Sequence, residues 1–218
     1  MRKPLLWLIV LLTALMPLLA CAEGEAPAFY VLRDGVRFDV TIQSLGTVYT
    51  TVVCENEVLT IPTGQLKWDD DISTDERALA SVTADVRGYT PLLTKASRHA
   101  PALGSCVYGQ LLLVLDYSAT YCRVWTKGQV GYVRTNNLDF YPRTPDPTDK
   151  APKAGVLVAK KNDTVTLRAR RDTHSLTVAR LPVGTKVWVL NHKNDFYLIE
   201  ADGYRGYVPE KKVELAED

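Results

Sequence analysis

The chain has 218 residues and a nearly balanced charge, with 26 lysines and arginines against 25 aspartates and glutamates. A net charge of +1 gives no basic surface of the kind that nucleic acids or anionic lipids require, so neither is expected as a partner. Recognition must rest on shape, hydrogen bonds and aromatic faces, for which 11 tyrosines and 4 tryptophans are available.

The N-terminus has the pattern of a secretory signal peptide. Two basic residues precede an apolar run over residues 5–19, and Ala20-Cys21-Ala22 has the small-x-small form of a cleavage site. The run is shorter than the roughly 20 residues of a membrane span, so we expect no transmembrane anchor. We predict a cleaved signal peptide at 1–22 and a secreted or cell-envelope protein. Lipid anchoring at Cys21 is the alternative, because the four residues that end there also resemble a bacterial lipobox.

The last two thirds of the chain contain an ungapped repeat with a step of 75 residues. Moving residues 78–138 forward by this step brings many identical residues together. Among them are Leu92 with Leu167, His99 with His174, Gly109 with Gly184, Gly128 with Gly203, and Gly131-Tyr132-Val133 with Gly206-Tyr207-Val208. A unit of about 60 residues is therefore used at least twice.

A divergent copy precedes these two. Residues 49–62 and 35–40 overlay the last copy at steps of 147 and 149 residues, so the loop between them is two residues longer. Leu59 stands where the later copies have a glycine, and the first half of the unit is largely missing. We predict a truncated or divergent unit at 23–68.

Apolar residues alternate with a period of two, and no sustained helical pattern appears, which predicts strands throughout. The alternating pairs are Val187 and Val189, Tyr197 and Ile199, Leu111 and Leu113, and Cys122 and Val124. Asp202-Gly203 and Lys127-Gly128 predict tight hairpin turns, because glycine permits positive φ at little cost. The sequence therefore predicts an all-β chain.

Several stretches of the last copy follow one another in a characteristic order. They are Leu167-Arg168-Ala169-Arg170, Leu181 to Leu190, Phe196-Tyr197-Leu198-Ile199 and Gly206-Tyr207-Val208. This order and spacing resembles the bacterial SH3-like (SH3b) domain over 155–215, and again over 78–140. The resemblance implies tandem small SH3-like β-barrels and attachment to the bacterial cell wall through peptidoglycan peptides.

Two polar segments divide the chain. Three consecutive aspartates open the first, and four prolines without apolar periodicity mark the second. The predicted division is a signal peptide at 1–22, a truncated or divergent SH3-like unit at 23–68, a linker at 69–77, an SH3-like domain at 78–140, a Pro-rich linker at 141–154 and an SH3-like domain at 155–218.

Aromatic and basic residues gather around the second hairpin of each full unit, where rigid aromatic faces bind peptides or sugars at low entropic cost. The ligand-binding candidates are Tyr121, Arg123, Trp125, Phe196, Tyr204 and Arg205. By strand alternation the four aromatic members are expected on the outer face. In the overlay Trp125 stands opposite Glu200, so the two units need not share one ligand.

Cysteine and histidine offer little chemistry. Cys106 and Cys122 are both expected to point inward, where they either form a disulfide or are small apolar core residues. No pair of histidines has metal-ligand spacing, and no cofactor motif appears, so we predict neither metal nor cofactor. A hydrolase would need a thiol such as Cys106 activated by His99, but a core position would keep that thiol inert.

These patterns predict a non-catalytic, exported cell-envelope binding protein whose partner is peptidoglycan or another exported protein. Tandem units could raise the avidity for a polymer if each one binds it. An extracellular scaffold or sensor is the first alternative. A cell-wall hydrolase is the second, although the separate catalytic domain that such enzymes carry is missing from the sequence.

Overall fold

The computed structural model describes residues 26–69, 75–83, 88–144, 151–160 and 163–216. The predicted signal peptide at 1–22, including Cys21, lies outside them, as does part of each predicted linker. The described elements are antiparallel strands and short 3-10 helices, which confirms the all-β fold. The helices are η1 (Thr63–Gln65), η2 (Asp75–Arg77), η3 (Thr135–Asn137) and η4 (Glu210–Lys212).

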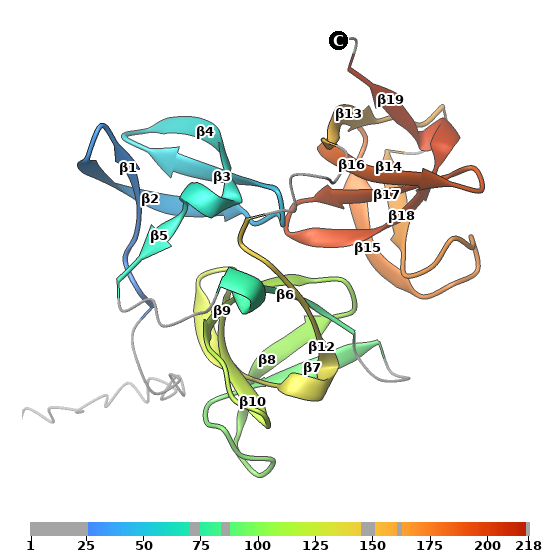
Figure 1. Cartoon of the computed structure of the whole chain (residues 1–218). Coiled ribbons are helices and arrows are strands. Elements are labelled where there is room, and N and C mark those ends of the chain that lie inside the picture. Colours follow the sequence, from blue (N-terminus) through green and yellow to red (C-terminus); the bar gives the residue numbers. More distant parts are fainter. Residues whose placement is uncertain (1–25, 70–74, 84–87, 145–150, 161–162, 217–218) are drawn as a thin grey trace, which may run out of the picture.

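Three separate sheets make up the structure, and each defines one unit (Figure 1). The first unit has five strands in the order β4-β3-β2-β1-β5. They are β1 (Phe29–Arg33), β2 (Val36–Ser44), β3 (Tyr49–Cys54), β4 (Glu57–Pro62) and β5 (Lys67–Trp68).

The second and third units have seven strands each, in the orders β12-β6-β9-β10-β11-β7-β8 and β15-β14-β18-β17-β16-β13-β19. The second unit contains β6 (Leu79–Val82), β7 (Tyr89–Leu93), β8 (Ala102–Val107), β9 (Leu111–Asp116), β10 (Tyr121–Thr126), β11 (Gln129–Arg134) and β12 (Leu138–Tyr141). The third contains β13 (Lys153–Leu157), β14 (Thr164–Arg168), β15 (Thr177–Pro182), β16 (Lys186–Lys193), β17 (Phe196–Ala201), β18 (Tyr204–Pro209) and β19 (Val213–Leu215).

The three units share one strand order. In each unit the last strand pairs with the first strand at one edge, and a three-stranded meander follows. The second and third units add an outer hairpin, β7-β8 or β14-β15, which has no counterpart in the first sheet. This shared order is what the predicted repeat implies, although the repeat and the unit boundaries remain predictions.

Two glycines that the overlay aligned lie where the outer hairpin crosses the sheet. A Cβ atom at Gly131 would stand 2.7 Å from the Leu92 side chain, and one at Gly206 would stand 2.8 Å from that of Leu167. Only glycine allows so close an approach. Leu59 occupies the matching place in the first unit, where no outer hairpin covers it, so a side chain fits there.

The predicted tight turns are confirmed. Asp202 and Gly203 have φ values of 51° and 75°, and Lys127 and Gly128 have φ values of 47° and 82°. Two successive residues with positive φ are typical of the two-residue hairpin turn whose twist matches that of the flanking strands.

Strand β9 is buried on both faces, which the predicted alternation did not show. Leu112 and Val114 pack in the core of the second unit, whereas Leu111, Leu113 and Leu115 belong to a cluster that also contains first-unit residues. The sequence of β9 is therefore a nearly continuous apolar run, as is typical of strands that are covered on both faces. The first and second units share one apolar core across this face.

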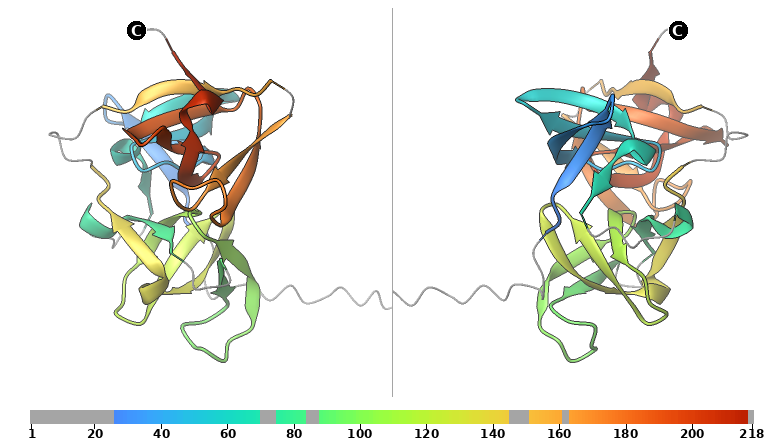
Figure 2. Two further views of the ribbon diagram at one scale, coloured as in Figure 1. Left: turned by 90° about the vertical axis from the view of Figure 1, so that its right-hand side faces the viewer. Right: turned by 60° about the vertical axis from the view of Figure 1, so that its left-hand side comes forward.

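The turn between β17 and β18 joins the third unit to the second. The Leu111 amide donates to the Gly203 carbonyl oxygen at 2.8 Å, and the Arg205 amide donates to the Gly109 carbonyl oxygen at 2.7 Å. These bonds flank an isolated antiparallel bridge between Gln110 and Tyr204. The third unit therefore contacts the second directly, and in both turned views the second unit lies below the other two (Figure 2).

Candidate functional site

A cleft of about 590 Å³ lies between the first and third units. Small-ligand sites commonly have volumes of roughly 300–1,000 Å³ and often lie at the junction of two domains. Strands β2 to β4 form one wall, and β13, β16 and β17 form the other. The lining residues include Tyr49, Thr51 and Thr60 on the first wall, and Gly155, Lys186 and Trp188 on the second.

Strand alternation places two aromatic side chains in this cleft. Val187 and Val189 point into the core of the third unit, so Trp188 between them points outward. Tyr49 likewise precedes the fully buried Thr50 and faces out of the first sheet. The two rings stack with centroids 4.3 Å apart and planes inclined by 30°. Such a pair presents a rigid aromatic surface at low entropic cost.

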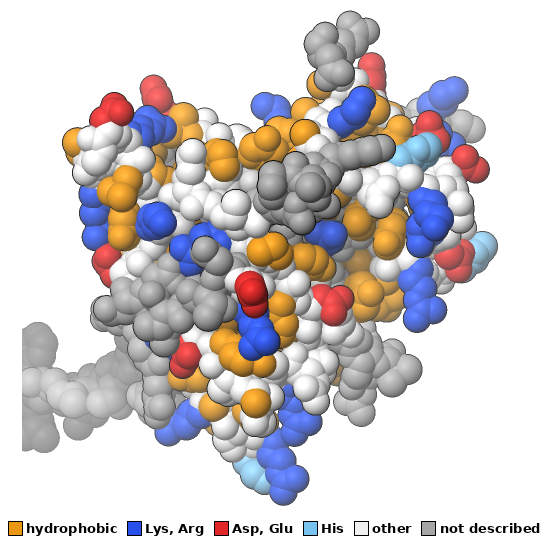
Figure 3. Space-filling model, in the orientation of Figure 1, with side chains coloured by type: hydrophobic (Ala, Val, Ile, Leu, Met, Phe, Trp, Pro, Cys, Tyr) orange, Lys and Arg blue, Asp and Glu red, His pale blue; other side chains and the backbone are white. Residues whose placement is uncertain are grey.

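The charges of the cleft are balanced. Lys186 and Asp202 are exposed residues of its lining, and the buried Glu200 carboxylate bonds Arg205 at 3.0 Å. Lysine, arginine, aspartate and glutamate side chains are likewise dispersed over the face shown in Figure 3. Recognition in the cleft therefore depends on aromatic contact and hydrogen bonds more than on net charge.

A second hollow, of about 190 Å³, adjoins the cleft, because both are lined by Ser44, Leu45 and Asp202. It extends to Trp125 and Lys127 of the second unit. The cleft and the adjoining hollow together are therefore lined by residues of all three units.

The third unit forms the wall that contains Trp188, and the sequence of this unit matches a known domain family. Residues 163–214 match the bacterial SH3 domain family. The matched segment includes β14 to β18 and therefore contains Trp188 and Glu200. The bacterial SH3 domain thus provides most of one side of the cleft.

Two solved structures resemble the chain, NlpC2 and NlpC1 from Trichomonas vaginalis, each with 14% sequence identity. The alignments cover 65% and 66% of this chain, with TM-scores of 0.27 and 0.28. They cover 49% and 48% of the other chains, so this chain spans about half the length of those proteins. A comparison with curated proteins gave no match.

The six ligand-binding candidates from the sequence do not form one site, and none of them lines the larger cleft. Tyr121 and Trp125 are only 8% and 7% exposed, so neither offers a free aromatic face to a ligand. Trp125 does point away from the core of its own unit, but the first unit covers it. Its ring stands edge-on to that of Phe29, with centroids 5.1 Å apart.

Two further candidates contact neighbouring units. The Lys127 ammonium donates to the Tyr204 hydroxyl at 2.6 Å, and Arg205 bonds both Glu200 and Thr47. The last two candidates, Arg123 and Phe196, are half-buried. Three of the six candidates, Trp125, Tyr204 and Arg205, therefore lie at contacts between units, which alternation within a single unit cannot reveal.

Sequence analysis missed the two aromatic residues that line the cleft. Trp188 was detectable, because it lies between two inward-facing valines in a predicted strand. Tyr49 was harder to find, because its role depends on the packing of one unit against another.

The three described cysteines, Cys54, Cys106 and Cys122, are free and buried. The disulfide considered for Cys106 and Cys122 is absent, and both side chains pack in the core of the second unit. Burial raises the pKa of Cys106 to about 12 and also raises the pKa of Cys122. A thiol of this kind stays protonated near neutral pH, whereas a nucleophile must be a thiolate.

The described part of the chain contains no group of three or more histidine, cysteine, aspartate or glutamate side chains that could hold a metal ion. Outside the ranges left undescribed, no helix has the length and hydropathy of a membrane span.

Proposed function

We propose that the chain is a non-catalytic, exported protein of the bacterial cell envelope that binds peptidoglycan peptides in the cleft between its first and third units. The match of residues 163–214 to the bacterial SH3 domain supports cell-wall-related binding. That family is typical of extracellular and cell-envelope proteins, in agreement with the predicted signal peptide.

The stacked Tyr49 and Trp188 rings are the observation that carries the proposed site. Thr51, Thr60, Lys186 and Asp202 line the same cleft. A peptide of the wall carries apolar side chains together with amino and carboxylate groups. Aromatic faces, threonines and one exposed residue of each charge suit a ligand of this mixed character.

The non-catalytic part of the proposal rests on the thiol that a hydrolase would need. Cys106 is 1% exposed, and its raised pKa disfavours the thiolate. His99, by contrast, lies in an exposed position.

Sedimentation with insoluble peptidoglycan tests the proposal. Residues 23–218 are incubated with purified cell wall and centrifuged, and the fraction of protein in the pellet is measured against wall concentration. We expect saturable binding that soluble wall fragments reverse. Protein that stays wholly in the supernatant would refute the proposal. Affinity capture of one defined envelope protein would then favour the scaffold alternative.

A further inference from the structure

The loop between β2 and β3 is the part of the first unit that reaches Glu200 of the third. It has four residues, Leu45–Val48, whereas the corresponding loop of the third unit has two, Asn194–Asp195. The difference matches the two additional residues that the overlay steps of 147 and 149 revealed. The sequence insertion therefore coincides with an inter-unit contact.

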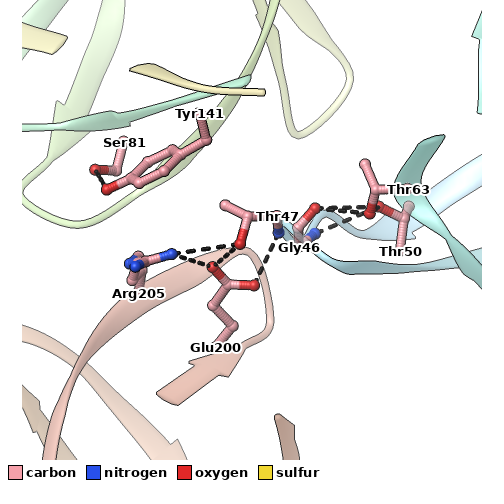
Figure 4. A network of polar contacts seen from close by, with 8 residues as sticks. All are labelled: Gly46, Thr47, Thr50, Thr63, Ser81, Tyr141, Glu200 and Arg205. Atoms are coloured by element: carbon pink, nitrogen blue, oxygen red, sulfur yellow. Dashed lines mark hydrogen bonds and ion pairs between the residues drawn. The ribbon is translucent and has the colours of Figure 1, made fainter. Parts of the chain in front are cut away.

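Thr47 of this loop binds Glu200 through both its backbone and its side chain (Figure 4). Its amide donates to Glu200 Oε2 at 2.8 Å, and its hydroxyl donates to Oε1 at 2.6 Å. Arg205 Nη1 donates to the same Oε1 at 3.0 Å and to the Thr47 hydroxyl oxygen at 3.3 Å. We call these three residues the Thr47 network.

Burial makes this network costly to break. Glu200 is only 2% exposed, and a buried carboxylate is tolerated where a cation and hydrogen-bond donors compensate its charge. The Arg205 guanidinium also lies 4.6 Å from the centre of the Tyr141 ring of the second unit. The Thr47 network therefore contacts all three units.

Buried hydroxyls hold the loop in one conformation. Thr63 donates to the Gly46 carbonyl oxygen at 2.9 Å, and its hydroxyl lies 2.8 Å from that of Thr50. A Cβ atom at Gly46 would collide with the Tyr49 carbonyl oxygen and would stand 3.2 Å from Glu200 Oε2. Glycine at this position thus allows the loop to approach the third unit closely.

The network connects the two walls of the cleft at the level of the aromatic pair. Glu200 is the direct cross-strand partner of Trp188 in the β16–β17 pairing. Thr47 precedes Tyr49 by two residues in the chain. A change in the Thr47 to Glu200 contact is therefore expected to alter the separation of Tyr49 and Trp188.

We propose that Thr47 and Glu200 are positioning residues that fix the width of the cleft. The chain then binds its ligand as one body, in one composite site between the first and third units, and not through separate sites on independent units. This inference rests on the proposed function and specifies how that site is assembled.

Two substitutions at one position test the inference. Thr47→Val keeps the shape and the amide but removes the hydroxyl, whereas Thr47→Ser keeps the hydroxyl. In wall sedimentation with the full exported chain, we expect Thr47→Val to weaken the apparent affinity about tenfold, the order expected for a lost hydrogen bond to a charged group. Thr47→Ser should bind within twofold of wild type.

Thr90→Val is the matched control. Thr90 is a 1% exposed threonine of the second unit whose hydroxyl accepts a hydrogen bond from Asn137 Nδ2 at 2.7 Å. The substitution should lower Tm while leaving the apparent affinity unchanged. Wild-type affinity in Thr47→Val, or an equal loss in Thr90→Val, would overturn the positioning role.

A measurement without ligand separates this inference from the proposed function. The near-UV circular dichroism difference between wild type and Trp188→Ala isolates the signal of the stacked rings. That signal should be lost in Thr47→Val and kept in Thr47→Ser. If the signal changes as expected but wild type does not sediment, the proposed function fails alone. If it is unchanged in Thr47→Val, the positioning role fails whether or not the wall is bound.

Discussion

An alanine at Gly109 is expected to lower the free energy of unfolding by about 3 kcal/mol. Two costs combine in this value. Gly109 has a φ of 75°, a conformation that costs an L-residue roughly 1–2 kcal/mol. Its Cβ atom would also collide with the Arg205 carbonyl oxygen of the third unit, and forced overpacking costs about 1–3 kcal/mol. Urea denaturation followed by tryptophan fluorescence measures the change.

Gly184→Ala is the matched control, because the overlay aligns Gly184 with Gly109. Gly184 has a φ of 87°, but no atom lies within 4 Å of the position that its Cβ would take. We expect this variant to lose only the backbone cost of roughly 1–2 kcal/mol. The difference between the two variants reports the contact between the second and third units. Equal losses would show that the added Cβ does not collide with the third unit.

Trp188→Ala is expected to weaken binding to peptidoglycan about 30-fold, because aromatic residues at the centre of a binding site typically cost about 2 kcal/mol or more when truncated. The ring stacks on Tyr49 and is only partly buried, so its removal should leave the fold intact. The apparent affinity is measured by wall sedimentation, and circular dichroism in the far UV checks the fold.

Phe196→Ala is the control that distinguishes the cleft from the surface inferred from sequence. Phe196 is half-buried on the same sheet, and it does not line the cleft. We expect the apparent affinity of the Phe196→Ala variant for peptidoglycan to stay within twofold of wild type. A large loss in Phe196→Ala with none in Trp188→Ala would move the site to the second hairpin and contradict the cleft.

Features that depend on contacts within one unit could be predicted from the sequence. Period-two alternation predicted the strands, and glycine in the Asp202-Gly203 turn predicted a positive φ that the structure has. The coincidence of Gly131 with Gly206 also has a local cause, because each faces a leucine of the outer hairpin. Such features depend on neighbours within the unit, whose order the sequence preserves.

Features that depend on contacts between units could not be predicted from the sequence. Trp125 and Trp188 both point away from the core of their own units. Phe29 of the first unit packs against Trp125, whereas Trp188 lines a cleft. Alternation predicts that a side chain points away from the core of its own unit, but it does not predict whether another unit covers that side chain. The longer loop that carries Thr47 was visible as an insertion, but its partner Glu200 lies 153 residues away.

Hydrogen exchange of the backbone amides, with and without soluble peptidoglycan fragments, tests most directly whether the cleft is the binding site. A ligand held between two walls slows local opening on both of them. We expect slower exchange in β3 (Tyr49–Cys54) and β16 (Lys186–Lys193) at the same fragment concentration. Slowing in only one of these strands, or on the hairpin that contains Tyr121 with both walls unchanged, would contradict a composite site.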